Sequence, residues 1–279
     1  MDTTIIPSLA SRPLLQRAVR SSWRAILRHR IGQRLVIGLA TTFLISVTAG
    51  SAAGAGIRAH VQATQQLAVL LTTHGVHREP EAQFPQVALV AATRPITGEQ
   101  TTLPVIGHSV SPGGMRWLKV MLPGRPNGST GWIAAQGTRR LVTGWHIVVD
   151  LAGRRVSVYR HGHVVRTFQA VVGKPSTPTP TGQFFVEETV QMTAGHPGGP
   201  FALALSARSN ALQEFEGGPG QIALHGRNNL GGALGTAASH GCVRLDTASI
   251  DWLAARIGPG IPTTIYADHN RPEPFAAAG

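Results

Sequence analysis

The sequence contains few cysteine, tyrosine and other aromatic residues. It has one cysteine and two tyrosines, and aromatic residues make up only 5% of its 279 positions. A single cysteine excludes an internal disulfide and a zinc cluster built on several thiolates. The low aromatic content, together with 33 glycines and 19 prolines, favours short strands joined by turns over a helical bundle.

Acidic side chains are also scarce: 13 Asp and Glu stand against 25 Lys and Arg, giving a formal net charge of +12. Such a surplus favours nucleic acid or an anionic surface as partner. Half of it, however, comes from residues 1–34, which carry seven arginines and one acid. The rest of the chain is only mildly basic. We therefore expect no nucleic-acid partner, and an anionic wall polymer or lipid fits better.

Residues 35–57 form a 23-residue run without a charged side chain. An α-helix of this length spans a bilayer core of about 30 Å. Because arginines precede the run, the positive-inside rule puts residues 1–34 in the cytoplasm and the following chain outside. The small residues at 49–56 also resemble a signal-peptidase site. Both a single-pass anchor, which we favour, and a cleaved signal fit, and either one predicts an extracytoplasmic protein of the cell envelope.

Two stretches with different patterns follow this segment. Residues 58–84 are rich in Gln, Thr, Ala and His and are predicted to be a spacer, with a short helix near 61–71. Residues 85–142 alternate apolar segments with turn clusters, as β-strands do. This stretch resembles the end of a bacterial SH3-like module, because it contains, in the same order, Trp117, a turn at Asn127-Gly128 and a Gly-Trp-Ile segment. Trp117 and Trp132 would anchor the core of such a small β-barrel.

Residues 143–268 are predicted to form a second β domain, followed by a tail at 269–279, which makes the chain mainly β. Apolar patterning predicts strands at 146–151, 154–160, 163–172, 183–188, 201–206, 221–225 and 263–266. Asp246 is expected to cap a helix over 247–257. The adjacent Glu187 and Glu188 would face opposite sides of a strand, so we expect one solvated and one half-buried carboxylate.

The reactive side chains gather between His225 and Arg244, a glycine-rich stretch that includes the only cysteine. A free thiol has a pKa near 8.5, so Cys242 needs a base to act as a nucleophile at neutral pH. Either His225 or His240 can accept the thiol proton. His240 lies two residues before Cys242, so their side chains would point the same way in an extended strand. The N–H groups of Gly241 and Cys242 are candidate oxyanion donors.

These residues resemble the catalytic domain of the YkuD-type L,D-transpeptidases. The resemblance rests on His-Gly, the glycine-rich loop and Ser-His-Gly-Cys-Val-Arg, and on the upstream run at 171–186. It covers about residues 145–267 and implies a β-sandwich with one helix after the cysteine. It contains two separate motifs in the family's order, with no departure at a catalytic position.

The resemblance also implies a role for each matched residue. Cys242 corresponds to the nucleophile, and His225 to the general base and later acid. The carbonyl group of Gly226 would orient the imidazole, and Arg244 would bind a substrate carboxylate in a bidentate manner. The residues that would support the thiol or the oxyanion are Ser239, His240 and Gly241.

The implied substrates are peptidoglycan stem peptides. The thiolate would attack the L-centre carbonyl of the third residue in a donor tetrapeptide, release terminal D-alanine and form a thioester. A second stem's amine would then give a 3→3 cross-link, and water would give L,D-carboxypeptidase activity. No metal or organic cofactor is implied, and β-lactams of the carbapenem class are expected to acylate the same thiol.

Other functions are compatible with parts of the sequence. A sortase is also an exported cysteine transpeptidase, but its Thr-Leu-x-Thr-Cys pattern is missing. NlpC-type peptidases place the cysteine before the histidine, the reverse of the order here. A zinc site at His225, His240 and Cys242 lacks an evident fourth ligand. A non-catalytic wall-binding protein would tolerate loss of the cysteine.

Overall fold

The computed structural model describes residues 61–215 and 217–267, and all of them lie within one compact unit, 54–279. The segment predicted as anchor or signal, 35–57, lies outside the described residues, as do 1–34 and the tail at 269–279. Within the described ranges, no helix is long and apolar enough to cross a membrane. The chain is mainly β, as the composition predicts.

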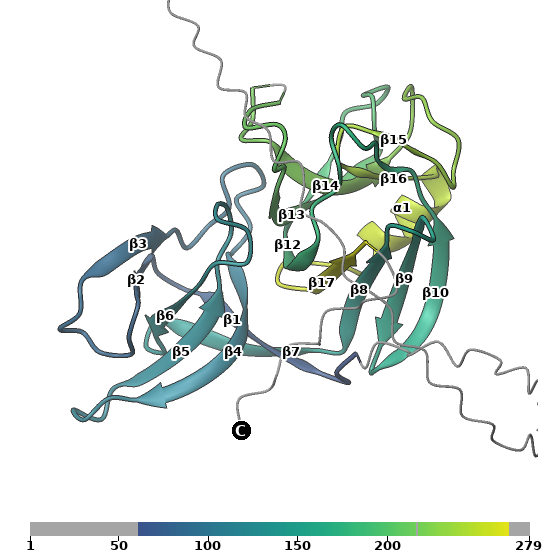
Figure 1. The fold of residues 1–279 in the computed structure, drawn as a ribbon. Helices are drawn as coiled ribbons and strands as arrows, with labels where there is room; N and C mark the ends of the chain where they lie inside the picture. Colours follow the sequence, from purple (N-terminus) through teal and green to yellow (C-terminus); the bar gives the residue numbers. More distant parts are fainter. Residues whose placement is uncertain (1–60, 216, 268–279) are drawn as a thin grey trace, which may run out of the picture. The chain divides into compact units, whose positions relative to one another are not determined.

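Residues 65–143 form an antiparallel sheet with the strand order β3-β2-β6-β5-β4-β1-β7 (Figure 1). Its strands are β1 (Gln65–Leu70), β2 (His74–His77), β3 (Gln86–Val90), β4 (Thr102–Val110), β5 (Arg116–Met121), β6 (Thr130–Ala134) and β7 (Thr138–Thr143). We call these residues the N-terminal module. Trp117 is 2% exposed and lies in its interior, as expected, whereas Trp132 is half-buried beneath the Lys119 ammonium. Its SH3-like identity stays a prediction.

The residues predicted as a spacer contain two of these strands, so that prediction is wrong, as is the helix near 61–71. β1 pairs with both β4 and β7, and β2 pairs with β3 and β6. His74, within the predicted spacer, is 5% exposed, and its ring nitrogens contact the carbonyl groups of Thr72 and Gln136. The partners of β1 lie tens of residues away along the chain, so local composition gave no sign of the pairing.

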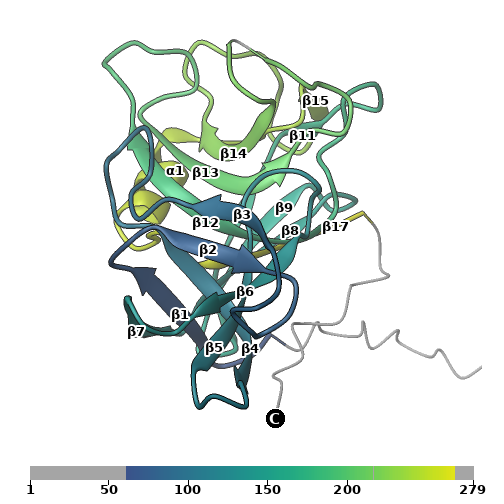
Figure 2. The same ribbon diagram turned by 90° about the vertical axis from the view of Figure 1, so that its left-hand side faces the viewer.

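Eight of the ten remaining strands in the described residues form a mixed sheet in the order β10-β9-β8-β17-β12-β13-β14-β16 (Figures 1 and 2). These strands, one helix and their connecting loops carry the predicted catalytic residues, and we therefore call residues 145–266 the catalytic region. Its elements are β8 (Trp145–Asp150), β9 (Arg155–Arg160), β10 (His163–Gln169), β11 (Val172–Gly173), β12 (Gly182–Gln191), β13 (Phe201–Arg208), β14 (Gln221–Gly226), β15 (Ala237–Ser239), β16 (Val243–Leu245), α1 (Thr247–Ala254) and β17 (Pro262–Tyr266). β11 and β15 form a separate parallel pair. Two pairs within the large sheet are also parallel, β17 with β8 and β14 with β16.

The single described helix begins where the sequence predicts. The carboxylate of Asp246 accepts hydrogen bonds from the backbone N–H of Ser249, at 2.8 Å, and from its hydroxyl. These contacts satisfy donors that the first turn of a helix leaves unpaired. Ile250 and Leu253 are fully buried in the core of the catalytic region, so α1 fixes the chain that leaves β16.

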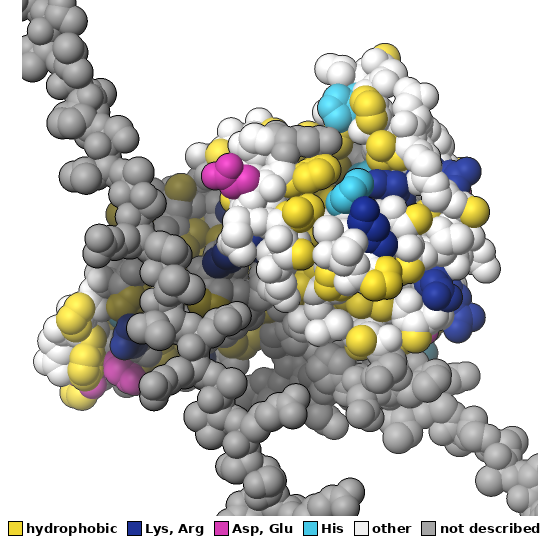
Figure 3. Space-filling model, turned by 45° about the horizontal axis from the view of Figure 1, so that its top comes forward, with side chains coloured by type: hydrophobic (Ala, Val, Ile, Leu, Met, Phe, Trp, Pro, Cys, Tyr) yellow, Lys and Arg dark blue, Asp and Glu magenta, His cyan; other side chains and the backbone are white. Residues whose placement is uncertain are grey.

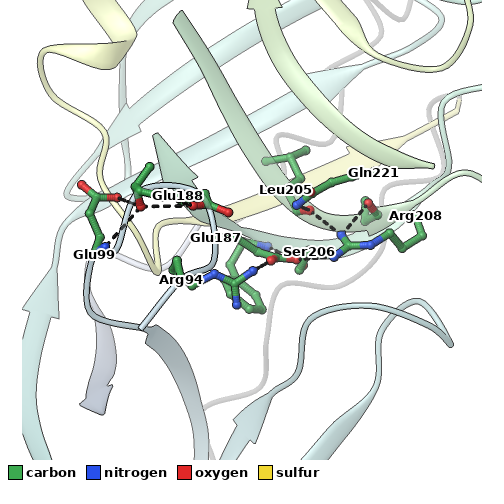
Figure 4. A network of polar contacts seen from close by, with 11 residues as sticks. Arg94, Glu99, Glu187, Glu188, Leu205, Ser206, Arg208 and Gln221 are labelled. Carbon is green, nitrogen blue, oxygen red and sulfur yellow. Dashed lines mark hydrogen bonds and ion pairs between the residues drawn. The ribbon is translucent and has the colours of Figure 1, made fainter. Parts of the chain in front are cut away.

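β12 is buried on both faces, which the sequence does not reveal. Phe184 packs in the core of the catalytic region, whereas Phe185 packs in the core of the N-terminal module. Glu187, also on β12, forms ion pairs with Arg94 of the module and with Arg208 of β13, at 3.0 Å in the second case (Figure 4). Burial lowers the pKa of both arginines, because desolvation disfavours the charged form.

The expectation for the two glutamates is therefore wrong: Glu187 and Glu188 are each 1% exposed. The Glu188 carboxylate accepts hydrogen bonds from the backbone N–H and hydroxyl of Thr97, at 3.0 and 3.1 Å. A register shift between Val186 and Glu188 interrupts the regular alternation, and the N-terminal module covers the face that would otherwise be solvated.

Candidate active site

The parallel pairing of β14 with β16 brings His225 and Cys242 to one face of the sheet. In this pair Leu224 is opposite Val243, and His225 is opposite Arg244. Leu224 and Val243 are fully buried, so side chains one residue away on either strand point to the other face. Cys242 immediately precedes β16, and like His225 it is half-buried. Its sulfur lies 3.9 Å from the carbonyl oxygen of Gln221.

The turn before Cys242 is held by Ser239, whose side chain is fully buried. Its hydroxyl accepts a hydrogen bond from the Gly241 N–H at 3.1 Å and donates to the Cys242 carbonyl at 2.6 Å. Gly241 has φ +123°, and a Cβ there would lie 3.1 Å from the Ile222 methyl group. Glycine is required here on both grounds. The Gly241 N–H, a predicted oxyanion donor, is bonded to Ser239.

The proline-rich segment after β11 supports the same turn from outside. The hydroxyl groups of Thr177 and Thr179 donate to the carbonyl oxygens of Ser239 and Gly241, at 3.2 and 2.7 Å. Both threonines are buried. Sequence reasoning missed them: the Thr-Pro alternation marks an irregular segment but does not indicate its partner.

The His225 ring is oriented by a backbone carbonyl group. Its Nδ1 lies 2.6 Å from the Gly226 oxygen. Because a carbonyl oxygen can only accept, Nδ1 carries the hydrogen and a neutral ring has its lone pair on Nε2. Gly198, with φ +85°, packs against the ring: a Cβ there would lie 2.8 Å from Nδ1. A Cβ on Gly226 would overlap the Gly199 carbonyl oxygen, so these glycines let the loop before β13 cover the imidazole.

His240 does not have the geometry expected of an extended strand. The positive φ of Gly241 interrupts the strand between His240 and Cys242, and β16 begins only at Val243. The exposed His240 ring stacks on Phe215, with 5.7 Å between ring centroids, and its Nε2 lies 3.5 Å from the Lys174 ammonium. Like Thr177 and Thr179, Lys174 was not singled out from the sequence.

Arg244 is held by the glycine-rich loop. Its guanidinium donates to the Gly231 carbonyl at 2.8 Å, and its backbone exchanges two hydrogen bonds with Val171. Basic and histidine side chains lie side by side among apolar ones on the face that comes forward in Figure 3. Within residues 61–215 and 217–267, no three His, Cys, Asp or Glu side chains gather in a way that could hold a metal ion.

This region is similar to known proteins. Residues 144–265, less than half of the chain, match the family model YkuD, described as the L,D-transpeptidase catalytic domain. The YkuD protein of Bacillus subtilis is 30% identical over 121 residues, which are 43% of this chain and 65% of that protein. L,D-transpeptidase 1 of Mycobacterium tuberculosis is 30% identical over 125 residues, or 42% of this chain and 49% of that protein.

A solved structure, L,D-transpeptidase 3 of M. tuberculosis with a faropenem-derived adduct, is 15% identical over 58% of this chain and 93% of that one, with a TM-score of 0.37. The chain thus spans somewhat less than two thirds of the B. subtilis relative and about half of L,D-transpeptidase 1. The family match and the two sequence relatives support an L,D-transpeptidase catalytic domain in the region that carries His225 and Cys242.

Proposed function

We propose that this protein is an extracytoplasmic L,D-transpeptidase that forms 3→3 cross-links between peptidoglycan stems through a thioester on Cys242. The observation that carries the proposal is the parallel pairing of β14 with β16, which leaves Cys242 and His225 half-buried on one face. A nucleophile and a base supplied by adjacent strands are the minimal machinery for acyl transfer.

In the first step the thiol proton moves to Nε2 of His225 as the sulfur bonds to the L-centre carbonyl carbon of the third donor residue. The imidazolium then returns the proton to the leaving nitrogen, the C–N bond breaks and D-alanine departs. In the second step an acceptor amine attacks the thioester and loses a proton to His225, and Cys242 is regenerated. Water in place of the amine gives the L,D-carboxypeptidase reaction. The Nδ1 contact with Gly226 keeps Nε2 in its proton-accepting form.

The oxyanion of each tetrahedral intermediate would be stabilised by backbone N–H groups. We assign this role to Cys242, and to Gly241 when its N–H exchanges Ser239 for the oxyanion. Ser239 then acts by shaping the turn, since its fully buried side chain is closed to a substrate. His240 lies at the rim of the site, where it supports the substrate rather than the thiol.

Donor peptides carry carboxylates, and two cations lie on the segments around the proposed nucleophile, Arg244 on β16 and Lys174 next to His240. Arg244 is the predicted carboxylate ligand, and it would use guanidinium N–H groups other than the one bonded to Gly231. Lys174 is a second candidate because its ammonium lies beside His240. Carbapenems are expected to acylate Cys242, since they present a strained carbonyl group to the same thiolate.

The remaining parts of the proposal concern the rest of the chain. Residues 35–57 would anchor the protein in the membrane or direct its secretion, and 143–268 would form the catalytic domain. The N-terminal module would be SH3-like, with its limits moved from 85–142 to include β1 and β2.

Replacing the sulfur tests the proposal directly. Purified Cys242→Ala protein is expected to form no 3→3 dimer from tetrapeptide muropeptides, and His225→Ala to lose at least a hundredfold in rate. His163→Ala, a change at an exposed histidine of β10, is the matched control. Intact-mass analysis after carbapenem treatment should locate one adduct on Cys242. Dimer formation by Cys242→Ala would refute the mechanism, and wall binding without turnover by the wild type would favour the non-catalytic alternative.

A further inference from the structure

The loop between β5 and β6 of the N-terminal module reaches the catalytic region and binds the loop between β13 and β14. Arg125 donates hydrogen bonds to three carbonyl oxygens there: Ser209 at 2.8 Å, Leu212 at 3.1 Å and Pro219 at 2.8 Å. One guanidinium thus ties both ends of that loop together. Gly220 permits this approach, because a Cβ there would overlap the Leu212 carbonyl oxygen and lie 3.2 Å from the guanidinium.

Asn127 makes a second set of contacts two residues further on. Its amide exchanges hydrogen bonds with the backbone of Arg208, both at 2.8 Å, and donates to the Asn210 side chain at 3.3 Å. Paired bonds of this kind fix orientation as well as distance. The Asn-Gly turn predicted from the sequence therefore also joins the two parts of the molecule.

The loop that these residues hold reaches the candidate active site. Phe215 lies on it and stacks on the His240 ring with an interplanar angle of 29°. Gln221, where β14 begins, carries the carbonyl oxygen that lies 3.9 Å from the Cys242 sulfur. Both Phe215 and His240 are exposed, and His240 is two residues before Cys242 in the sequence, so their stack is available to contact a peptide bound at the sulfur.

We propose that Arg125 and Asn127 are positioning residues for the acyl transfer: they fix the loop between β13 and β14, and thereby hold Phe215 against His240 as part of a peptide-binding wall. The N-terminal module then completes the active site. This inference rests on the proposed function for its kinetic test, but its geometric test is independent of turnover.

The kinetic test uses the full chain with Arg125→Ala, Phe215→Ala and the double variant. We expect kcat/KM for the donor tetrapeptide to fall about tenfold in each single variant, mainly through KM, because a displaced wall weakens substrate placement. The double variant should lose no more than Phe215→Ala alone, since Arg125 acts through Phe215. Arg140→Ala, at an exposed arginine of β7, is the control. Unchanged kinetics in Arg125→Ala, or multiplied losses in the double variant, would overturn the inference.

The geometric test follows the His240 ring protons by NMR. Arg125→Ala should change their chemical shifts in the same direction as Phe215→Ala does. Phe215→Ala removes the aromatic ring that stacks on His240, and Arg125→Ala lets that ring move away. Arg125→Lys keeps the charge but lacks the two separated guanidinium nitrogens that donate to the three carbonyl groups, and should give the same shift. Thermal unfolding confirms that each variant folds. If the His240 chemical shifts of both Arg125 variants equal those of the wild type, the inference is overturned. If these shifts change in the variants but the wild-type protein is inactive, only the proposed function is contradicted.

Discussion

The side chains around Glu187 and those around Cys242 are both brought together by strand pairing, but they meet in opposite environments. Glu187 is 1% exposed and is surrounded by the guanidinium groups of Arg94 and Arg208. Cys242 and His225 are half-buried and are held by backbone groups and by the hydroxyl of Ser239. The first arrangement closes an interface with compensated charges. The second keeps reactive groups accessible on a rigid support. Changes at Glu187 should therefore alter stability, and changes at the Cys242 site should alter activity.

The largest expected effect on stability comes from neutralising Glu187. Glu187→Gln leaves two buried guanidinium groups without their counter-charge and should lower the free energy of unfolding by about 3–5 kcal/mol. Urea unfolding monitored by tryptophan fluorescence measures it. Glu79→Gln changes an exposed carboxylate and should cost less than about 0.5 kcal/mol. Equal unfolding midpoints for Glu187→Gln and Glu79→Gln would contradict a structural role for the buried charges around Glu187.

The buried and uncharged side chain of His146 predicts how the stability of the protein depends on pH. Desolvation lowers the pKa of His146 to about 4, and its Nε2 lies 2.8 Å from the Thr264 hydroxyl. The unfolded chain binds a proton near pH 6.5 and the folded one does not, so acidification favours unfolding. Stability should fall by roughly 2 kcal/mol between pH 7 and pH 5 from this group. In His146→Gln that part of the decline should vanish, whereas His163→Gln should keep it. A parallel decline in all three proteins would contradict the assignment.

On the side of the proposed active site, a marked loss of activity is expected from Gly198→Ala, which replaces neither reacting group. The added methyl group would lie 2.8 Å from Nδ1 of His225 and should displace the ring, lowering kcat about tenfold. Gly195→Ala is a matched control, because Gly195 also has positive φ, +78°, but nothing lies within 4 Å of its Cβ position. Both variants should lose about 1–2 kcal/mol of stability from backbone strain. The loss of activity should be confined to Gly198→Ala, and equal activities would argue against a role for His225.

The smallest expected effect is that of Lys174. Removing its charge with Lys174→Met should raise KM for the tetrapeptide by about two- to fivefold, because an ion pair at an accessible site contributes at most about 1 kcal/mol. Lys174→Arg should retain most of the affinity, and the thermal midpoint should stay unchanged in both. Steady-state kinetics should be measured at low ionic strength, because salt then screens the charge of Lys174 least and the difference in KM is largest. An unchanged KM would leave Arg244 as the carboxylate ligand.

Local patterns predicted most strands of the catalytic region and the cap at Asp246. Alternation of apolar residues is a property of neighbours in sequence, so it survives without tertiary context. The sequence does not reveal β1 and β2, because the partners of β1 lie tens of residues away and β2 is only four residues long with a histidine at each end. Glu187 and Glu188 were misplaced for a related reason: the surface that buries them belongs to another part of the chain.

The motif around Cys242 predicts its chemistry, which stays a prediction, and it does not reveal the residues that hold the turn. Ser239, Gly241 and the cysteine are adjacent in sequence, so their turn could be anticipated. Thr177, Thr179 and Gly198 reach the same site from other loops, and no local signal connects them with it. The expected alignment of His240 with Cys242 failed because a glycine with positive φ interrupts the strand.

The sequence by itself determined the residue types available for chemistry, the mainly β character and the positions of most strands, because composition and periodicity act over a few residues. The tertiary structure decided which histidine shares a face with the cysteine, which loops hold their geometry and which charged groups become buried. These outcomes depend on the pairing of β14 with β16 and on the packing of the N-terminal module against β12. Both bring together residues that only the folded chain places in contact.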